Sequence, residues 1–123
     1  MMTHCVFEYL YRDAGNFKAR GELLLEGRLE DADLSLLHSR FENGEHFIAE
    51  QIGVPTLYEA LWQQCESGPS EEMDHVWHEF SEVRAATAED FTRLKLWGLA
   101  KDLRTNIVNV DAWKLQLSRN WEL

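Results

Sequence analysis

The stretch that decides the fold reads VFEYLY at residues 6–11, DAGN at residues 13–16 and FKARGELLL at residues 17–25. The aromatic and β-branched residues of the first run favour an extended strand. Asp, Gly and Asn between the two runs supply the conformations and side-chain hydrogen bonds of a tight turn. The stretch therefore predicts an N-terminal β-hairpin.

After the hairpin, the spacing of apolar residues changes to that of helices. Leu34, Leu37 and Phe41 recur three and four residues apart, which predicts a helix over residues 32–41. A Thr-x-x-Glu capping pattern after a Gly-Val-Pro entry predicts a second helix over residues 56–65.

The second half of the chain repeats this alternation. Val76, His78 and Phe80 alternate as one face of a strand would, so residues 74–84 are predicted to be extended. The sequence TAED at residues 87–90 resembles a helix start and is followed by apolar residues at helical spacing, which predicts one helix over 88–103.

These elements predict a single compact α+β domain over residues 1–123. A small antiparallel sheet containing the hairpin would be packed by about three short helices. Residues 106–121 fit either a strand or a helix.

Charge is segregated along the chain. Residues 30–90 carry fifteen acidic residues against Arg40 and Arg84, whereas residues 91–123 are net basic. An acidic middle repels nucleic acid and anionic membrane and attracts basic proteins. Basic residues interleaved with Trp near the C-terminus are also found in single-strand binders. They are more simply explained by pairing with the acidic middle, within one fold or across a homodimer, so direct nucleic-acid binding is not expected.

Localisation follows from what the sequence lacks. The N-terminus has no signal-peptide pattern, and no apolar window approaches the length of a membrane span. Cys5 and Cys65 have no CxxC spacing and suit free thiols of a reducing compartment. We therefore expect a cytoplasmic protein, with the general character of a small bacterial one.

Two constellations of polar residues are candidates for chemistry. The segment DHVWHE at residues 74–79 contains Asp74, His75, His78 and Glu79, whose donors suit zinc or iron, with His46 as a distant third imidazole ligand. On a strand, however, His75 and His78 face opposite sides, so neither a metal nor another cofactor is expected. The simpler interpretation places His78 in the sheet and leaves His75 solvated.

The second constellation lies at the hairpin turn, where Arg12, Asp13, Asn16 and Lys18 are compatible with a site for an anion or a carboxylate. Turn chemistry alone also accounts for the Asp and Asn, and the two basic residues are ordinary strand-end charges.

The predicted function is a protein-binding module for a basic partner, of the inhibitor, immunity or adaptor kind. The second helix is apolar on two sides, so its Tyr58–Trp62 stripe is either buried within the domain or offered to a partner. The residues expected to contact the partner are Tyr58, Trp62, Glu71, Glu72, Asp74 and Glu79. The alternative is a small metal-dependent or acid–base enzyme that uses Asp74, His75, His78 and Glu79.

Overall fold

A computed structural model describes residues 3–123 and contains a five-stranded mixed sheet, in the order β3-β4-β1-β2-β5. The strands are β1 His4–Arg12, β2 Lys18–Glu26, β3 His46–Phe47, β4 His78–Ala85 and β5 Leu96–Leu99. The helices are α1 Asp31–Arg40, α2 Ala49–Ile52, α3 Tyr58–Gln64, α4 Ala88–Arg93 and α5 Ala100–Val108, followed by a short 3-10 helix, Leu115–Leu117. The α+β class is confirmed. The sheet is larger than predicted and is not wholly antiparallel, because β2 and β5 run parallel.

The predicted hairpin is confirmed and forms the centre of the sheet. β1 and β2 pair antiparallel along their whole length, from His4 opposite Glu26 to Arg12 opposite Lys18. At the turn, Asp13 Oδ1 accepts hydrogen bonds from the backbone N–H groups of Gly15, at 2.9 Å, and Phe17, at 3.0 Å. This bonding of a short acidic side chain to its own turn is why the DAGN sequence stops the first strand.

The other predicted elements are confirmed in part. α1 and α3 lie where helices were predicted, but α3 is shorter than the expected residues 56–65. The predicted strand over 74–84 begins only at His78, because residues 74–77 form a loop that packs on the hairpin turn. The ambiguous residues 106–121 contain the end of α5 and the 3-10 helix, and otherwise form turns.

The prediction of one helix over residues 88–103 is wrong in its middle. Thr87 and Asp90 form the expected capping box and α4 begins there, but the chain turns extended at Leu94. β5 then pairs with the outer edge of β2, and α5 starts only at Ala100. A free strand edge offers a ladder of hydrogen bonds, and this tertiary pairing has overridden the helical spacing of the apolar residues.

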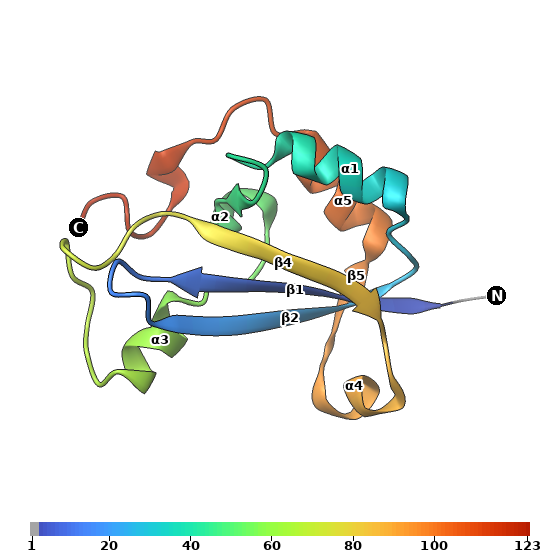
Figure 1. Cartoon of the computed structure of the whole chain (residues 1–123), viewed down its shortest axis with the longest axis horizontal. Helices are drawn as coiled ribbons and strands as arrows, with labels where there is room; N and C mark the ends of the chain where they lie inside the picture. Colours follow the sequence, from blue (N-terminus) through green and yellow to red (C-terminus); the bar gives the residue numbers. More distant parts are fainter. Residues whose placement is uncertain (1–2) are drawn as a thin grey trace.

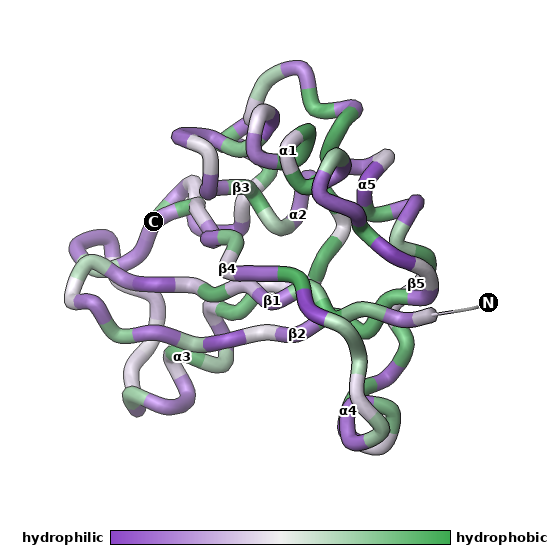
Figure 2. The backbone as a smooth tube through the Cα atoms, turned by 45° about the vertical axis from the view of Figure 1, so that its right-hand side comes forward, coloured by the Kyte–Doolittle hydropathy of each residue, from purple (hydrophilic) through white to green (hydrophobic). Residues whose placement is uncertain are grey.

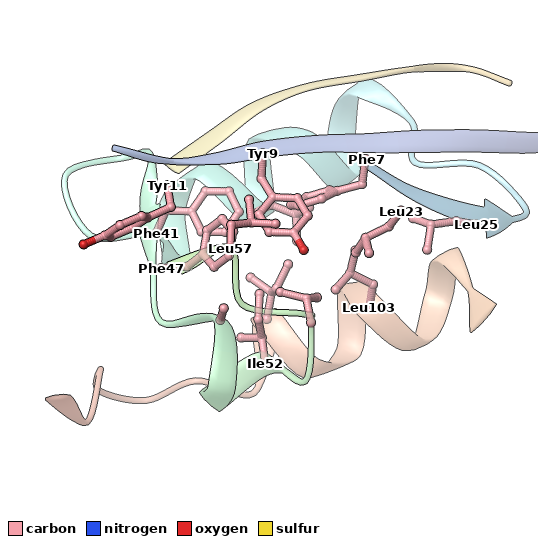
Figure 3. Packing of buried hydrophobic residues seen from close by; sticks show 14 of the residues in the cluster. Phe7, Tyr9, Tyr11, Leu23, Leu25, Phe41, Phe47, Ile52, Leu57 and Leu103 are labelled. Atoms are coloured by element: carbon pink, nitrogen blue, oxygen red, sulfur yellow. The ribbon is translucent and has the colours of Figure 1, made fainter. Parts of the chain in front are cut away.

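The core lies on one face of the sheet. Figure 3 shows Tyr9 of β1 and Leu23 of β2 pointing toward Ile52 of α2 and Leu103 of α5, and all four side chains are buried. Gly21 of β2 permits close packing here, since a Cβ atom at this position would lie 2.9 Å from Leu57 Cδ2. This arrangement fixes the end of the hairpin against the segment that leads into α3.

The opposite face of β1, β2 and β4 carries a network of ion pairs. Arg84 of β4 contacts Glu8 and Glu22 on the neighbouring strands, and its Nη1 lies 2.7 Å from Asp90 Oδ2 of α4. Arg93 contacts both Glu22 and Asp90. Both views show α4 away from α1, α2 and α5, below the strands (Figures 1 and 2). The network therefore holds the α4 excursion to the sheet and compensates its acidic side chains internally.

Candidate functional site

The candidate residues gather around the tip of the β1–β2 hairpin. The loop over residues 65–77, which joins α3 to β4, lies against this tip, and the Ala14 N–H donates to the Met73 carbonyl at 2.9 Å. Figure 1 shows the hairpin tip and the loop at the same end of the molecule as the C-terminus. Residues far apart in the sequence therefore meet here.

Asp74 holds the loop in place. Its Oδ2 accepts hydrogen bonds from Trp62 Nε1 at 3.0 Å and from the Ser70 N–H at 2.8 Å. Its Oδ1 accepts a hydrogen bond from the hydroxyl group of Tyr11, a buried residue of β1. Both carboxylate oxygens thus hold parts of the fold together, although Asp74 is only partly buried and also lines a hollow beside the hairpin turn.

The large side chains of the second predicted helix are buried, as the interior alternative required, whereas its small residues Ala60 and Cys65 are exposed. Tyr58 is fully buried, and its hydroxyl lies 2.9 Å from Ser118 Oγ and donates to the Val76 carbonyl at 3.2 Å. Trp62 is only 8% exposed, and the Arg119 guanidinium stacks over its ring. Neither residue can act as a freely exposed anchor, because the C-terminal segment and the loop cover them.

His78 lies in the core, as the simpler interpretation predicted. Its ring packs edge-on against Tyr58 with the centroids 4.8 Å apart, and its Nε2 accepts the Leu57 N–H at 3.0 Å. Burial, with a smaller effect of nearby His75, lowers the pKa of His78 to about 3. The imidazole is therefore neutral and is not available as a surface ligand or base.

His75 is partly exposed and is held by hydrogen bonds within the fold, whereas the prediction had it as a simple solvated residue. Its Nε2 lies 2.6 Å from the Arg12 carbonyl oxygen, and its Nδ1 accepts the Trp77 N–H at 3.0 Å. A carbonyl only accepts, so Nε2 must carry the proton. With one ring nitrogen donating and the other accepting, His75 is a bridge between β1 and the loop and has no lone pair left for a metal.

Glu79 is neutralised by Arg12. The guanidinium contacts both carboxylate oxygens, Nε to Oε1 at 3.0 Å and Nη2 to Oε2 at 3.2 Å, and this pairing raises the pKa of Arg12. The predicted anion site at the turn is not supported by these contacts, because Arg12 binds Glu79 and Asn16, and Asp13 caps the turn.

One feature of the alternative enzyme site is present. Arg12, His46, His75, Trp77 and Glu79 line a hollow of about 280 Å³, in which His46 Nε2 lies 3.8 Å from Glu79 Oε1. Asp74 and His78 are not among the residues that line this hollow. Within residues 3–123, no three His, Cys, Asp or Glu side chains are placed so that they could hold a metal ion.

Comparison with protein-family models, curated proteins and solved structures found no match to this chain. The site must therefore be interpreted from its own geometry. Among the residues that the structure describes, no helix is both long and apolar enough to cross a bilayer.

Sequence reasoning missed a groove between the hairpin tip and the loop, although it had named two of the lining residues, Trp62 and Asp74, as partner contacts. This turn–loop groove is a hollow of about 610 Å³, and its apolar residues are Phe17, Leu61, Trp62, Cys65 and Met73. Phe17 directly follows the turn and is 57% exposed, while Cys65 carries a free, exposed thiol. A large aromatic residue next to a turn was the available signal, since turns are usually polar.

Acidic residues border this groove. Glu66 lies between two lining residues of the loop, and Glu71 and Glu72 lie between two others, Ser70 and Met73. All three glutamates are exposed, and none has a cationic side chain within 4.0 Å among residues 3–123. Of the six residues expected to contact a partner, only Glu71 and Glu72 are both exposed and free of an internal partner.

The three arginines of the last third are paired with acids of this chain. Arg93 contacts Glu22, Arg104 Nε lies 2.8 Å from Asp33 Oδ1, and Arg119 Nη1 lies 3.5 Å from Glu59. The three lysines of this segment form no ion pair within residues 3–123, so these contacts compensate half of its basic charges. Even so, ion pairs within residues 3–123 involve only eight of the 22 acidic side chains.

Proposed function

We propose that this protein is a small acidic binding module that engages a basic partner protein, as an inhibitor, immunity protein or adaptor would. The observation that supports this most is the loop over residues 65–77, which presents Glu66, Glu71 and Glu72 without internal compensation. The net charge of −10 adds a long-range attraction for basic surfaces. Complementary charge of this kind speeds association and selects partners by sign.

The loop is suited to this role because it is held in one conformation. The hydrogen bond from the Ser70 N–H to Asp74 and that from the Ala14 N–H to Met73 fix the residues on either side of Glu71 and Glu72. A binding surface that is already ordered loses less conformational entropy when a partner docks. The glutamates are therefore carried by a backbone that is already ordered before the partner binds.

The test is a comparison of two charge-reversed variants of the full chain. Glu71→Lys with Glu72→Lys changes the loop, and Asp102→Lys with Asp111→Lys makes the same net change at exposed positions elsewhere. Basic proteins retained from the native source by the wild type are identified, purified and measured by stopped-flow association at several salt concentrations.

The loop variant should associate at least tenfold more slowly at low salt and lose most of the salt dependence. The control variant should show a much smaller change. Equal association rates for the two variants would contradict the proposal. So would the absence of any basic protein whose association depends on salt.

The second candidate is an acid–base enzyme, and the hollow that holds His46 beside Glu79 is the observation that favours it. Here His46 would move the proton, and Arg12 would hold the Glu79 carboxylate in place beside it. A hydrolase and isomerase substrate screen tests it, because any activity found should be lost in His46→Ala and retained in a His38→Ala control.

A further inference from the structure

The turn–loop groove has features of a docking site beyond its acidic border. Its apolar surface includes two largely buried side chains, Leu61 and Trp62, and the exposed ring of Phe17. An exposed aromatic ring beside a preformed apolar hollow is unfavourable in water unless something covers it. The volume of about 610 Å³ is enough for one large side chain and its flanking backbone.

The groove is already formed in the free protein. One wall is the hairpin turn and the other is the loop, and the Ala14–Met73 hydrogen bond of 2.9 Å joins them. The turn also packs closely on the loop, since a Cβ atom on Gly15 would lie 2.6 Å from Met73 Cε. An occupant therefore needs no opening motion before it can enter.

The charge around the groove identifies the chemistry of the occupant. Two aspartates, Asp13 and Asp74, line it, and Glu66, Glu71 and Glu72 follow its border, so five carboxylates surround an apolar centre. Lys18 follows Phe17 at one edge of the groove, and Arg119 stacks on Trp62 beside Glu59, so the carboxylates around the groove outnumber these cations. An acidic segment would be repelled here, and a purely apolar one would leave the carboxylates without counter-charges.

We propose that the turn–loop groove binds a segment of the basic partner in which one leucine or aromatic side chain is flanked by Lys or Arg residues. The apolar side chain enters the hollow beside Phe17 and packs on Leu61 and Trp62, and the flanking cations meet the glutamates of the loop. This proposal rests on the proposed binding function and specifies the class of segment that the module recognises.

The structure supplies its own reporter for the test. Cys65 is exposed and lines the groove, whereas Cys5 is buried, so N-ethylmaleimide should modify Cys65 alone. The adduct would occupy the groove without changing the charge of the protein. Cys65→Ser treated in the same way is the matched control, because it leaves the groove open.

The probe is the acetylated and amidated peptide Lys-Lys-Leu-Trp-Lys-Lys, titrated into the ¹⁵N-labelled full chain and followed by NMR. Lys-Lys-Gly-Ser-Lys-Lys controls for charge, and Glu-Glu-Leu-Trp-Glu-Glu controls for apolar character. Phe17→Ser removes the exposed wall of the groove, and Phe91→Ser alters a phenylalanine that is 50% exposed elsewhere.

The first peptide should bind at least tenfold more tightly than either control peptide. Phe17→Ser and the Cys65 adduct should each weaken it at least fivefold, while Phe91→Ser and treated Cys65→Ser should leave it unchanged. Binding that depends on Glu71 and Glu72 but not on Phe17 or Cys65 would overturn the groove and leave the charge-based function standing. Equal binding of Lys-Lys-Gly-Ser-Lys-Lys would also overturn the groove alone. Binding that depends on neither pair, or equal binding of Glu-Glu-Leu-Trp-Glu-Glu, would overturn both.

Discussion

The indole N–H of Trp62 donates to the carboxylate of Asp74 across 3.0 Å, and this contact ties α3 to the loop that precedes β4. The same carboxylate accepts a hydrogen bond from the hydroxyl group of Tyr11 in β1. One aspartate thus joins a helix, a strand and a loop, and its removal would leave two aromatic donors without an acceptor.

Asp74→Ala should therefore lower the free energy of unfolding by about 2 to 4 kcal/mol, because hydrogen bonds to a charged acceptor and the desolvated donors are lost together. Urea denaturation measures this. Glu71→Ala and Glu72→Ala are controls and should change stability by less than about 0.5 kcal/mol, as exposed surface substitutions usually do. Equal midpoints for all three variants would contradict the anchoring role of Asp74.

Truncation of Trp62 should strongly lower the free energy of unfolding. The side chain is only 8% exposed and packs with Tyr58, so Trp62→Ala should cost about 3 to 5 kcal/mol, mostly through the cavity it leaves. Trp121 is 50% exposed, and Trp121→Ala should cost well under about 1 kcal/mol. Thermal melts of the two variants compare them directly, and near wild-type stability of Trp62→Ala would show that this face of α3 is not part of the core.

The buried neutral His78 predicts a loss of stability on mild acidification. Its pKa is about 3 in the folded protein, against an ordinary value near 6.5. Between these values the unfolded chain binds a proton that the folded protein does not. The stability that His78 contributes is therefore complete above pH 6.5 and falls below it, by at most about 1.4 kcal/mol per pH unit.

Denaturation between pH 7.5 and pH 5 measures this slope. His78→Gln retains an acceptor for the Leu57 N–H but cannot be protonated, so its stability should depend less on pH than that of the wild type over this range. The other histidines are common to both proteins and cancel in the comparison. Parallel pH profiles would mean that His78 is protonated in the fold.

Chelation should not affect the protein. Both ring nitrogens of His75 are engaged and His78 is buried, so zinc has no set of free ligands in the segment 74–79. Protein dialysed without chelator should contain well under one equivalent of zinc or iron by elemental analysis, and EDTA should leave its melting temperature unchanged. A stoichiometric metal that disappears in His46→Ala would reverse this interpretation.

The hairpin could be predicted because its information is local. Asp13 bonds to amides two and four residues away, and the alternation in the flanking strands sets their pairing. β5 could not be predicted in this way. Leu96 pairs with Leu24, 72 residues earlier, and nothing around Leu96 distinguishes an edge strand from the turn of a helix.

The candidate site was predicted less well, for the same physical reason. Sequence proximity suggested that Asp74, His75, His78 and Glu79 act together, but each is bound by residues that are distant in the sequence. Asp74 binds Tyr11 and Trp62, His75 binds the Arg12 carbonyl, and Glu79 binds the Arg12 guanidinium. The turn–loop groove could not be predicted because its two walls are far apart in the sequence, with almost fifty residues between Phe17 and Cys65.

The central position of the hairpin also determines how the chain acquires its structure. β1 and β2 come first in the sequence, yet their outer partners are β4 and β5, which begin at His78 and Leu96. A nascent chain emerging from the ribosome therefore exposes two unpaired strand edges until most of the protein has been synthesised. Closure of such long loops is slow, and domains dominated by distant pairings fold on the order of milliseconds to seconds. Expression at low temperature or with chaperones should accordingly raise the soluble yield.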